Sequence, residues 1–122
     1  MKNGLSRKFG FTLVEIMIVV VIIGLLAAIA IPLFVKARNT SQATACINNL
    51  RQLEGAVETY ALENKLSSSA TYTISALQPY LRKHSGQSLP ECPASGTYSA
   101  GTTVTNPPTC SLSSFTPPHA LP

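Results

Sequence analysis

The feature that most constrains this chain is an apolar run over residues 11–35, which carries a single charged side chain, Glu15. Between residues 16 and 31 every position is apolar or glycine. About 20 such residues, rising roughly 1.5 Å each, span the ~30 Å hydrocarbon core of a bilayer. A helix of a soluble domain would show a polar stripe, and this run has none. The sequence therefore predicts a helix that lies in lipid or in a core made of many copies of itself.

The residues before the run indicate its orientation. They carry three basic side chains, Lys2, Arg7 and Lys8, and no acid, so the positive-inside rule keeps this end in the cytoplasm and exports the rest. A secretory signal peptide is the competing interpretation, because it also has a basic start and an apolar core. That core is shorter, and here the stretch 28–30 leads into further apolar residues. We therefore expect the apolar segment to be retained.

A short motif overlaps the start of the run. The sequence Lys8-Phe9-Gly10-Phe11-Thr12-Leu13-Val14-Glu15 resembles the type III signal of type IV pilins and of type II secretion pseudopilins. In that family a membrane peptidase cleaves after the glycine and methylates the new N-terminal phenylalanine. The resemblance is close over residues 8–38. It implies cleavage between Gly10 and Phe11, methylation of Phe11, and a role for Glu15 in subunit assembly.

Glu15 has two interpretations. An isolated carboxylate in hydrocarbon costs several kcal/mol unless it is protonated or paired. It can stay protonated or reach the membrane interface, or it can meet a positive charge when subunits pack. The resemblance supplies the partner, which is the N-terminal amine of Phe11 in a neighbouring subunit. Such a pair removes two buried charges at once and fixes the axial register of the subunits.

Gly24 and Pro32 both weaken the apolar helix. Proline removes one backbone hydrogen bond and clashes with the carbonyl four residues earlier, which favours a kink. Filaments of the family that this chain resembles lose helicity between such a glycine and such a proline after assembly. We therefore expect local bending or melting between Gly24 and Pro32 in a filament.

From residue 36 to residue 65 the pattern becomes that of an amphipathic helix. Its apolar positions recur at three- and four-residue steps: Ala43, Cys46, Ile47, Leu50, Leu53, Val57, Tyr60 and Ala61. The predicted fold is α+β, with one long pilin-like helix, hydrophobic and then amphipathic, and a small C-terminal head of short β-strands. The expected divisions are a leader (1–10), a transmembrane or filament-core helix (11–35), an amphipathic helix (36–66) and the head (67–122).

The expected head is small and rich in turns. Residues 75–83 indicate a short helix capped by Ser75. Residues 96–100 and 102–105 are rich in threonine and aromatic residues and predict a hairpin that turns at Gly101. Residues 110–112 suggest a third strand. The proline-containing tail, residues 115–122, is expected to run irregularly along the surface.

Three cysteines in an exported chain suggest one disulfide and one free thiol. Cys92 and Cys110 flank the predicted strands with 17 residues between them. Closing a loop of that size stabilises a fold by about 3 kcal/mol. The segments around both cysteines resemble the C-terminal hairpin of some short pilin-like proteins, which implies a Cys92–Cys110 bond. Cys46 is then a buried free thiol, although a bond from Cys46 to Cys92 or Cys110 stays open.

The sequence offers little support for catalysis or for a cofactor. Cys92, Cys110, His84 and His119 could be combined into a zinc site, but no CxxC or HxxxH spacing supports it. A calcium site needs several oxygens, whereas Glu91 is the one acid after Ser67. No GxSxG motif and no phosphate-binding loop is present. We therefore expect a protein that is not an enzyme and has no cofactor and no metal.

The charge balance argues against nucleic acid as a partner. The formal net charge is +4, but three of the nine basic residues lie in the leader, which leaves six against five glutamates. A DNA-uptake role would depend on Lys65, Arg82, Lys83 and His84, and the run Arg82-Lys83-His84 is more simply a solvated helix end.

The resemblance implies a structural subunit, held in the bacterial inner membrane before it enters a helical filament outside the cytoplasm. The implied partners are copies of the chain, a prepilin peptidase, a platform protein and an assembly ATPase. The alternatives are a pseudopilin of type II secretion, a minor or competence pilin, and a membrane-anchored binding module that never polymerises.

Overall fold

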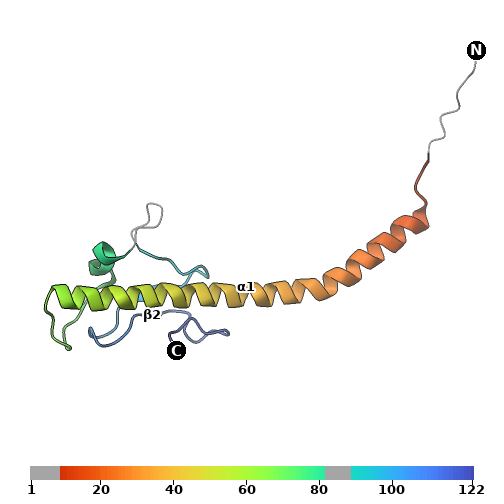
Figure 1. The fold of residues 1–122 in the computed structure, drawn as a ribbon. Coiled ribbons are helices and arrows are strands. Elements are labelled where there is room, and N and C mark those ends of the chain that lie inside the picture. Colours follow the sequence, from red (N-terminus) through yellow and green to blue (C-terminus); the bar gives the residue numbers. More distant parts are fainter. Residues whose placement is uncertain (1–8, 82–88) are drawn as a thin grey trace, which may run out of the picture. The chain divides into compact units, whose positions relative to one another are not determined.

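The computed structural model describes residues 9–81 and 89–122 (Figure 1). It contains a long helix, α1 (Leu13–Glu63), a 3-10 helix, η1 (Ile74–Tyr80), and two short strands, β1 (Tyr98–Ser99) and β2 (Thr109–Cys110). The chain divides into two compact units, Met1–Lys36 and Ala37–Pro122, and α1 contributes to both. We call the second unit the head unit. A long N-terminal helix followed by a small region with short strands confirms the α+β fold.

Thr12 caps the start of α1. Its hydroxyl Oγ1 accepts a hydrogen bond from the backbone N–H of Glu15 at 3.2 Å, and its carbonyl accepts one from Ile16 at 3.3 Å. The Thr-x-x-Glu spacing is that of a capping box. Glu15 lies in the first turn, where the helix dipole favours a negative charge. These contacts explain why the helix starts directly after Phe11-Thr12.

The helix then continues through both of its weak points. Gly24 and Pro32 lie inside α1, and the backbone is helical on either side of each. A Cβ atom added to Gly24 would meet no atom within 4 Å. The expected melting concerns the assembled filament, so it stays a prediction.

In the head unit, α1 forms one wall of the core. Its buried side chains are Ala43, Cys46, Leu50, Leu53, Ala56 and Val57. Five of them lie on the predicted apolar face, which is thereby confirmed, whereas Ile47, Tyr60 and Ala61 are only half-buried. The helix ends at Glu63, two residues before the expected end, and the Asn64 side chain donates a hydrogen bond to the Tyr60 carbonyl at 2.9 Å.

The segment after α1 returns along the helix as η1. Its Leu77 is fully buried in the core, and the Tyr80 ring meets the Tyr60 ring edge to face, with centroids 5.8 Å apart. The sequence predicts that this helix starts with a Ser75 cap. Instead it begins at Ile74, and Thr73 precedes it without a side-chain capping bond. Its tight 3-10 winding fits its length and the presence of Pro79, which has no N–H to donate. Residues 82 and 83 lie outside the described residues.

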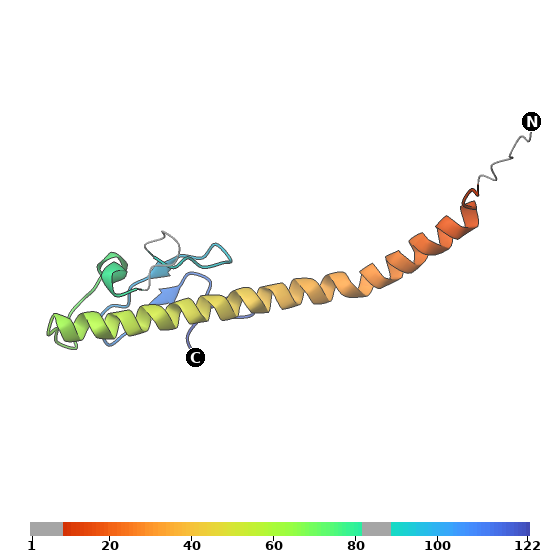
Figure 2. The same ribbon diagram turned by 45° about the horizontal axis from the view of Figure 1, so that its top comes forward.

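Strands β1 and β2 pair in antiparallel fashion, with Tyr98 opposite Cys110 and Ser99 opposite Thr109, and they lie beside the amphipathic half of α1 (Figure 2). β1 lies within the first strand of the predicted hairpin, but the prediction of a hairpin that turns at Gly101 is wrong, because β1 pairs with residues 109–110 and not with residues 102–105. Residues 102–105 form turns rather than a strand, and of the expected third strand only Cys110 is extended, as part of β2.

Local hydrogen bonds explain why residues 102–105 do not form a strand. The Asn106 N–H donates to the Thr103 carbonyl at 3.0 Å, and the hydroxyls of Thr103 and Thr105 bond to each other at 2.9 Å. Such short-range bonds compete with a strand ladder. A Cβ on Gly101 would collide with the backbone carbonyl of Asn106, so this turn requires glycine.

The two leucines Leu53 and Leu62 test the assignment of the head core. Leu53 is fully buried and Leu62 is 80% exposed, and both lie on α1. Leu53→Ala is expected to lower the free energy of unfolding by about 2–5 kcal/mol, because it leaves a cavity. Leu62→Ala is the matched control and should change it by less than about 0.5 kcal/mol. Urea unfolding of the full chain in mild detergent measures both, and equal effects would contradict the assignment.

Candidate functional site

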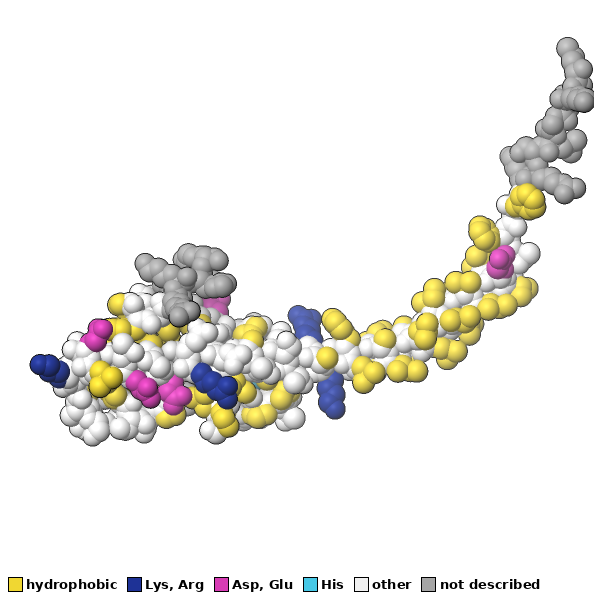
Figure 3. Space-filling view, in the orientation of Figure 1, with side chains coloured by type: hydrophobic (Ala, Val, Ile, Leu, Met, Phe, Trp, Pro, Cys, Tyr) yellow, Lys and Arg dark blue, Asp and Glu magenta, His cyan; other side chains and the backbone are white. Residues whose placement is uncertain are grey.

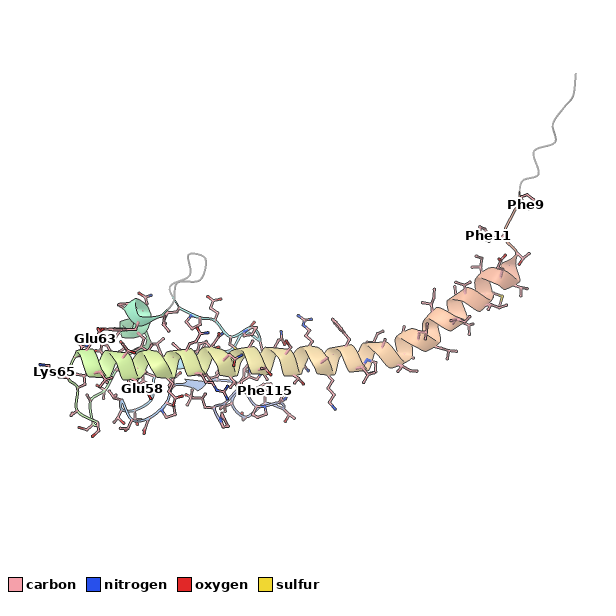
Figure 4. All side chains as sticks on the ribbon, in the orientation of Figure 1. Phe9, Phe11, Glu58, Glu63, Lys65 and Phe115 are labelled. Atoms are coloured by element: carbon pink, nitrogen blue, oxygen red, sulfur yellow. The ribbon has the colours of Figure 1, made fainter. Side chains whose placement is uncertain are left out.

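The first unit presents an apolar surface all around its helix. From Leu13 to Val35 the large apolar side chains are between 47% and 76% exposed, and side chains stand out from the helix on every side (Figures 3 and 4). The most apolar window of α1 has a mean hydropathy of 3.2 and is 0% buried. By length and composition α1 can cross a membrane. Apolar surface of this extent marks a site of contact with lipid or protein.

The expected processing junction lies next to this surface. Gly10 and Phe11 are outside the helix, and the Phe11 side chain is 82% exposed (Figure 4). A Cβ on Gly10 would meet no atom within 4 Å. Glu15 is also exposed, in the first turn of α1. A protease could therefore reach the peptide bond after Gly10, and the Glu15 carboxylate is open to a partner.

The head unit contains a second arrangement, buried in its core. Three thiols and one imidazole converge there, and we call them the cysteine–histidine cluster: Cys46, Cys92, Cys110 and His119. Their sulfur and ring nitrogen atoms all lie within 4.8 Å of one another. Each of the four residues is at most 5% exposed. Cys92 Sγ and His119 Nδ1 are 3.5 Å apart.

Four segments of the chain position these side chains. Cys46 comes from α1, Cys92 from the loop before β1, Cys110 from β2 and His119 from the C-terminal tail. Two amide side chains of α1 hold the Cys92 loop: Asn49 donates to the Glu91 carbonyl at 3.0 Å, and Gln42 donates to the Pro93 carbonyl at 3.2 Å.

Hydrogen-bond donors surround the sulfur atoms. The Tyr98 hydroxyl donates to Cys46 Sγ at 3.5 Å and accepts a hydrogen bond from Asn49 at 3.2 Å. Burial raises the pKa of the Cys46 thiol to about 12, and burial together with the bond to Cys46 raises the pKa of Tyr98. Burial also acts to raise the pKa of Cys92, but hydrogen bonds with the backbone of Ala94 and Gly96 and with the thiols of Cys46 and Cys110 together outweigh it, so this pKa lies below its ordinary value.

Gly96 leaves room for the cluster. A Cβ at this position would lie 2.8 Å from Cys110 Sγ and 3.1 Å from two side-chain atoms of Leu112. The preceding Ser95 has a φ of 64°, and its N–H donates to the Cys92 carbonyl at 2.9 Å. The turn after Cys92 thus passes close to β2, which a larger residue than glycine would prevent.

The structure brings Cys92 and Cys110 together, as expected from the sequence, and places Cys46 and His119 beside them, a set of four that the sequence does not indicate as a unit. All three cysteines are free thiols in this structure, so the Cys92–Cys110 disulfide stays a prediction. The tail was expected to run along the surface, but His119 is 5% exposed. His84, the other histidine considered for a zinc site, lies outside the described residues. No spacing signal in the sequence links Cys46 to His119.

Comparison with known proteins finds one family model and several relatives that match this chain. Residues 5–31 match the family model described as prokaryotic N-terminal methylation motif. The chain is 44% identical over 90 residues to a fimbrial protein of Pseudomonas aeruginosa, an alignment that covers 69% of this chain and 58% of that protein. It is 34% identical over 73 residues to the type II secretion system core protein G of Klebsiella pneumoniae, covering 60% and 52% of the two chains.

A third relative, the type IV major pilin protein PilA of Myxococcus xanthus, is 49% identical over 57 residues, covering 47% of this chain and 26% of that protein. The chain thus spans little more than half the length of the fimbrial and secretion proteins that it matches. No solved structure matches it significantly.

Gly96→Ala tests the close packing of the cluster. The added methyl group should force Cys110 and Leu112 apart and lower the melting temperature by several degrees, corresponding to about 1–3 kcal/mol. Gly55→Ala is the control, because a Cβ there meets no atom within 4 Å and alanine favours a helix. Thermal unfolding followed by circular dichroism measures both variants. A melting temperature of Gly96→Ala equal to that of the unaltered chain would contradict the packing described.

Proposed function

Because the chain belongs to the family of type IV pilins and type II secretion pseudopilins, we propose that it is the structural subunit of a pilus-like helical filament. Members of this family are structural subunits and not enzymes. The observation that carries the proposal is the apolar surface of the first unit, which is exposed on all sides from Leu13 to Val35. Many copies packed side by side would bury that surface.

The proposed maturation removes residues 1–10 and frees the Phe11 amine for methylation. Support comes from the methylation-motif match over residues 5–31 and from the exposed position of Gly10 and Phe11 outside the helix. Thr12 keeps its capping role after cleavage, because its bond to Glu15 lies wholly within the mature chain. The helix start would thus survive processing unchanged.

We assign Glu15 to subunit assembly, as the partner of the Phe11 amine of the next subunit. Phe11 and Glu15 flank the start of α1, and both are exposed. Burying the apolar helix in a filament would also bury this carboxylate, at a cost of several kcal/mol without a partner. A repeated amine–carboxylate pair removes that cost and fixes the axial step.

Each subunit would make the same head-to-tail contact with the next, which generates an open helical polymer. Before assembly the apolar helix would anchor the chain in the bacterial inner membrane, with the leader in the cytoplasm. The machinery implied is a prepilin peptidase, a platform protein and an assembly ATPase, and the finished filament would lie outside that membrane.

A second candidate is a pseudopilin of a type II secretion system, and the identity to core protein G favours it. A minor or competence pilin is a further variant of the same assembly. Nucleic acid is not proposed as a partner, because residues 11–122 carry six basic side chains against five glutamates and are near neutral. Arg82, Lys83 and His84, which a DNA-uptake role would use, lie outside the described residues.

Glu15→Gln tests the proposed function. The change removes the charge but keeps the size of the side chain, so membrane insertion and cleavage should proceed while filament yield falls by at least about tenfold, because an unpaired buried amine costs several kcal/mol. Glu58→Gln is the control, since Glu58 is exposed on the head unit. Quantification of sheared filaments measures both. A filament yield of Glu15→Gln equal to that of the control would overturn the assignment.

Gly24→Ala tests the proposed melting of the helix in the filament. Alanine should stabilise the helix by about 1 kcal/mol, and the subunit has open space for the methyl group. If residues 24–32 melt on assembly, the helical content per subunit falls when the unaltered chain polymerises, and it falls less in Gly24→Ala. Circular dichroism of subunits and of purified filaments measures this. Equal helical content in both states of the unaltered chain would contradict the melting.

A further inference from the structure

We propose that the cysteine–histidine cluster is a structural zinc site of the head unit. The proposal concerns the fold of the head and does not depend on filament assembly. It adds a metal that the sequence analysis did not expect, because the four residues have none of the spacings by which zinc sites are usually recognised. Ligand type, geometry and burial all point to zinc.

The ligand set is that of a closed structural site. Three cysteine sulfurs and one imidazole nitrogen form one of the common four-ligand sets of structural zinc. Structural sites fill all four coordination positions with protein ligands, whereas catalytic sites keep one position open to water or substrate. All four residues here are at most 5% exposed, so the cluster has the character of the closed kind.

The distances also fit. Zinc binds sulfur at about 2.3 Å and nitrogen at about 2.0–2.1 Å, so the ligand atoms of a tetrahedral site lie about 3.5–3.8 Å apart. Cys92 Sγ and His119 Nδ1 are 3.5 Å apart, and no two ligand atoms of the cluster are farther apart than 4.8 Å. A contraction of at most about 1 Å would therefore close the shell around an ion.

Groups around the cluster would support bound thiolates. The Tyr98 hydroxyl points to Cys46 Sγ and is itself held by Asn49, while backbone N–H groups of Ala94 and Gly96 point to Cys92 Sγ. Zinc with three thiolates carries one net negative charge, and such donors offset it. Binding would release the protons of the three thiols to solvent, and no atom changes its oxidation state.

A disulfide explains the cluster less completely. A Cys92–Cys110 bond would use two of the four groups and would leave the Cys46 thiol and the His119 imidazole buried beside it. A buried imidazole needs polar partners. In the described structure, His119 Nδ1 lies 3.5 Å from Cys92 Sγ, which a disulfide would occupy. A zinc ion uses all four groups and ties α1, the Cys92 loop, β2 and the tail together. A head of this size buries little core and gains much from such a link.

The test begins with protein isolated from its own membrane without chelator. Native mass spectrometry is expected to show one zinc per chain. The mass of the chain should rise by the mass of zinc less that of the protons that zinc displaces from the thiols. Loading the reduced full chain with Co²⁺ in detergent should give the visible spectrum of a tetrahedral thiolate site. Isolated chain that lacks zinc and has lost two hydrogens to a disulfide overturns the proposal, even if the reduced chain binds metal afterwards.

Variants separate the zinc site from a disulfide. Cys46→Ser and His119→Gln each remove one ligand but leave Cys92 and Cys110 free to pair, so both should lose at least about 100-fold in zinc affinity measured by chelator competition. Tyr98→Phe removes only the outer hydroxyl and should lose about 10-fold. His84→Gln, the control at the other histidine, should bind as the unaltered chain does. Zinc affinities of Cys46→Ser and His119→Gln equal to that of the control would overturn the proposal.

Discussion

The uncovered apolar surface of the first unit is the constraint on which the rest of this molecule depends. Water disfavours such a surface, and no residue in the described part of the subunit covers it. Lipid can cover it before assembly and neighbouring subunits can cover it afterwards. The same constraint applies to Glu15, the single carboxylate in this segment. Lipid or protein that covers the helix also surrounds this side chain and must stabilise or neutralise its charge.

In the head unit, the same helix has a buried face and forms part of a core. From Ala43 to Val57 the buried residues of α1 form the wall against which η1, β1 and β2 pack. Each strand is two residues long, so the hydrogen bonds between the strands contribute less to the stability of the head than the loops around them. Side-chain amides of α1, the Tyr72 hydroxyl bonded to the Gly101 N–H, and the cysteine–histidine cluster hold these loops in place.

The sequence predicts the long-range plan of the fold better than its local details. The apolar run and the three- and four-residue spacing of Leu50, Leu53 and Val57 depend on periodicity, so the helix and its buried face were predictable. The second strand was not, because threonines at 102–105 suit a strand by composition but bond to one another in a turn. The cluster joins residues as distant as Cys46 and His119, and only tertiary packing brings them together.

The most direct test of the central claim is to shear surface material from cells, examine it by electron microscopy and measure the intact mass of its main protein. The account predicts filaments built from a chain that begins at Phe11 and carries one added methyl group. A chain with an intact Met1 terminus, found only in the membrane and never in filaments, would contradict it.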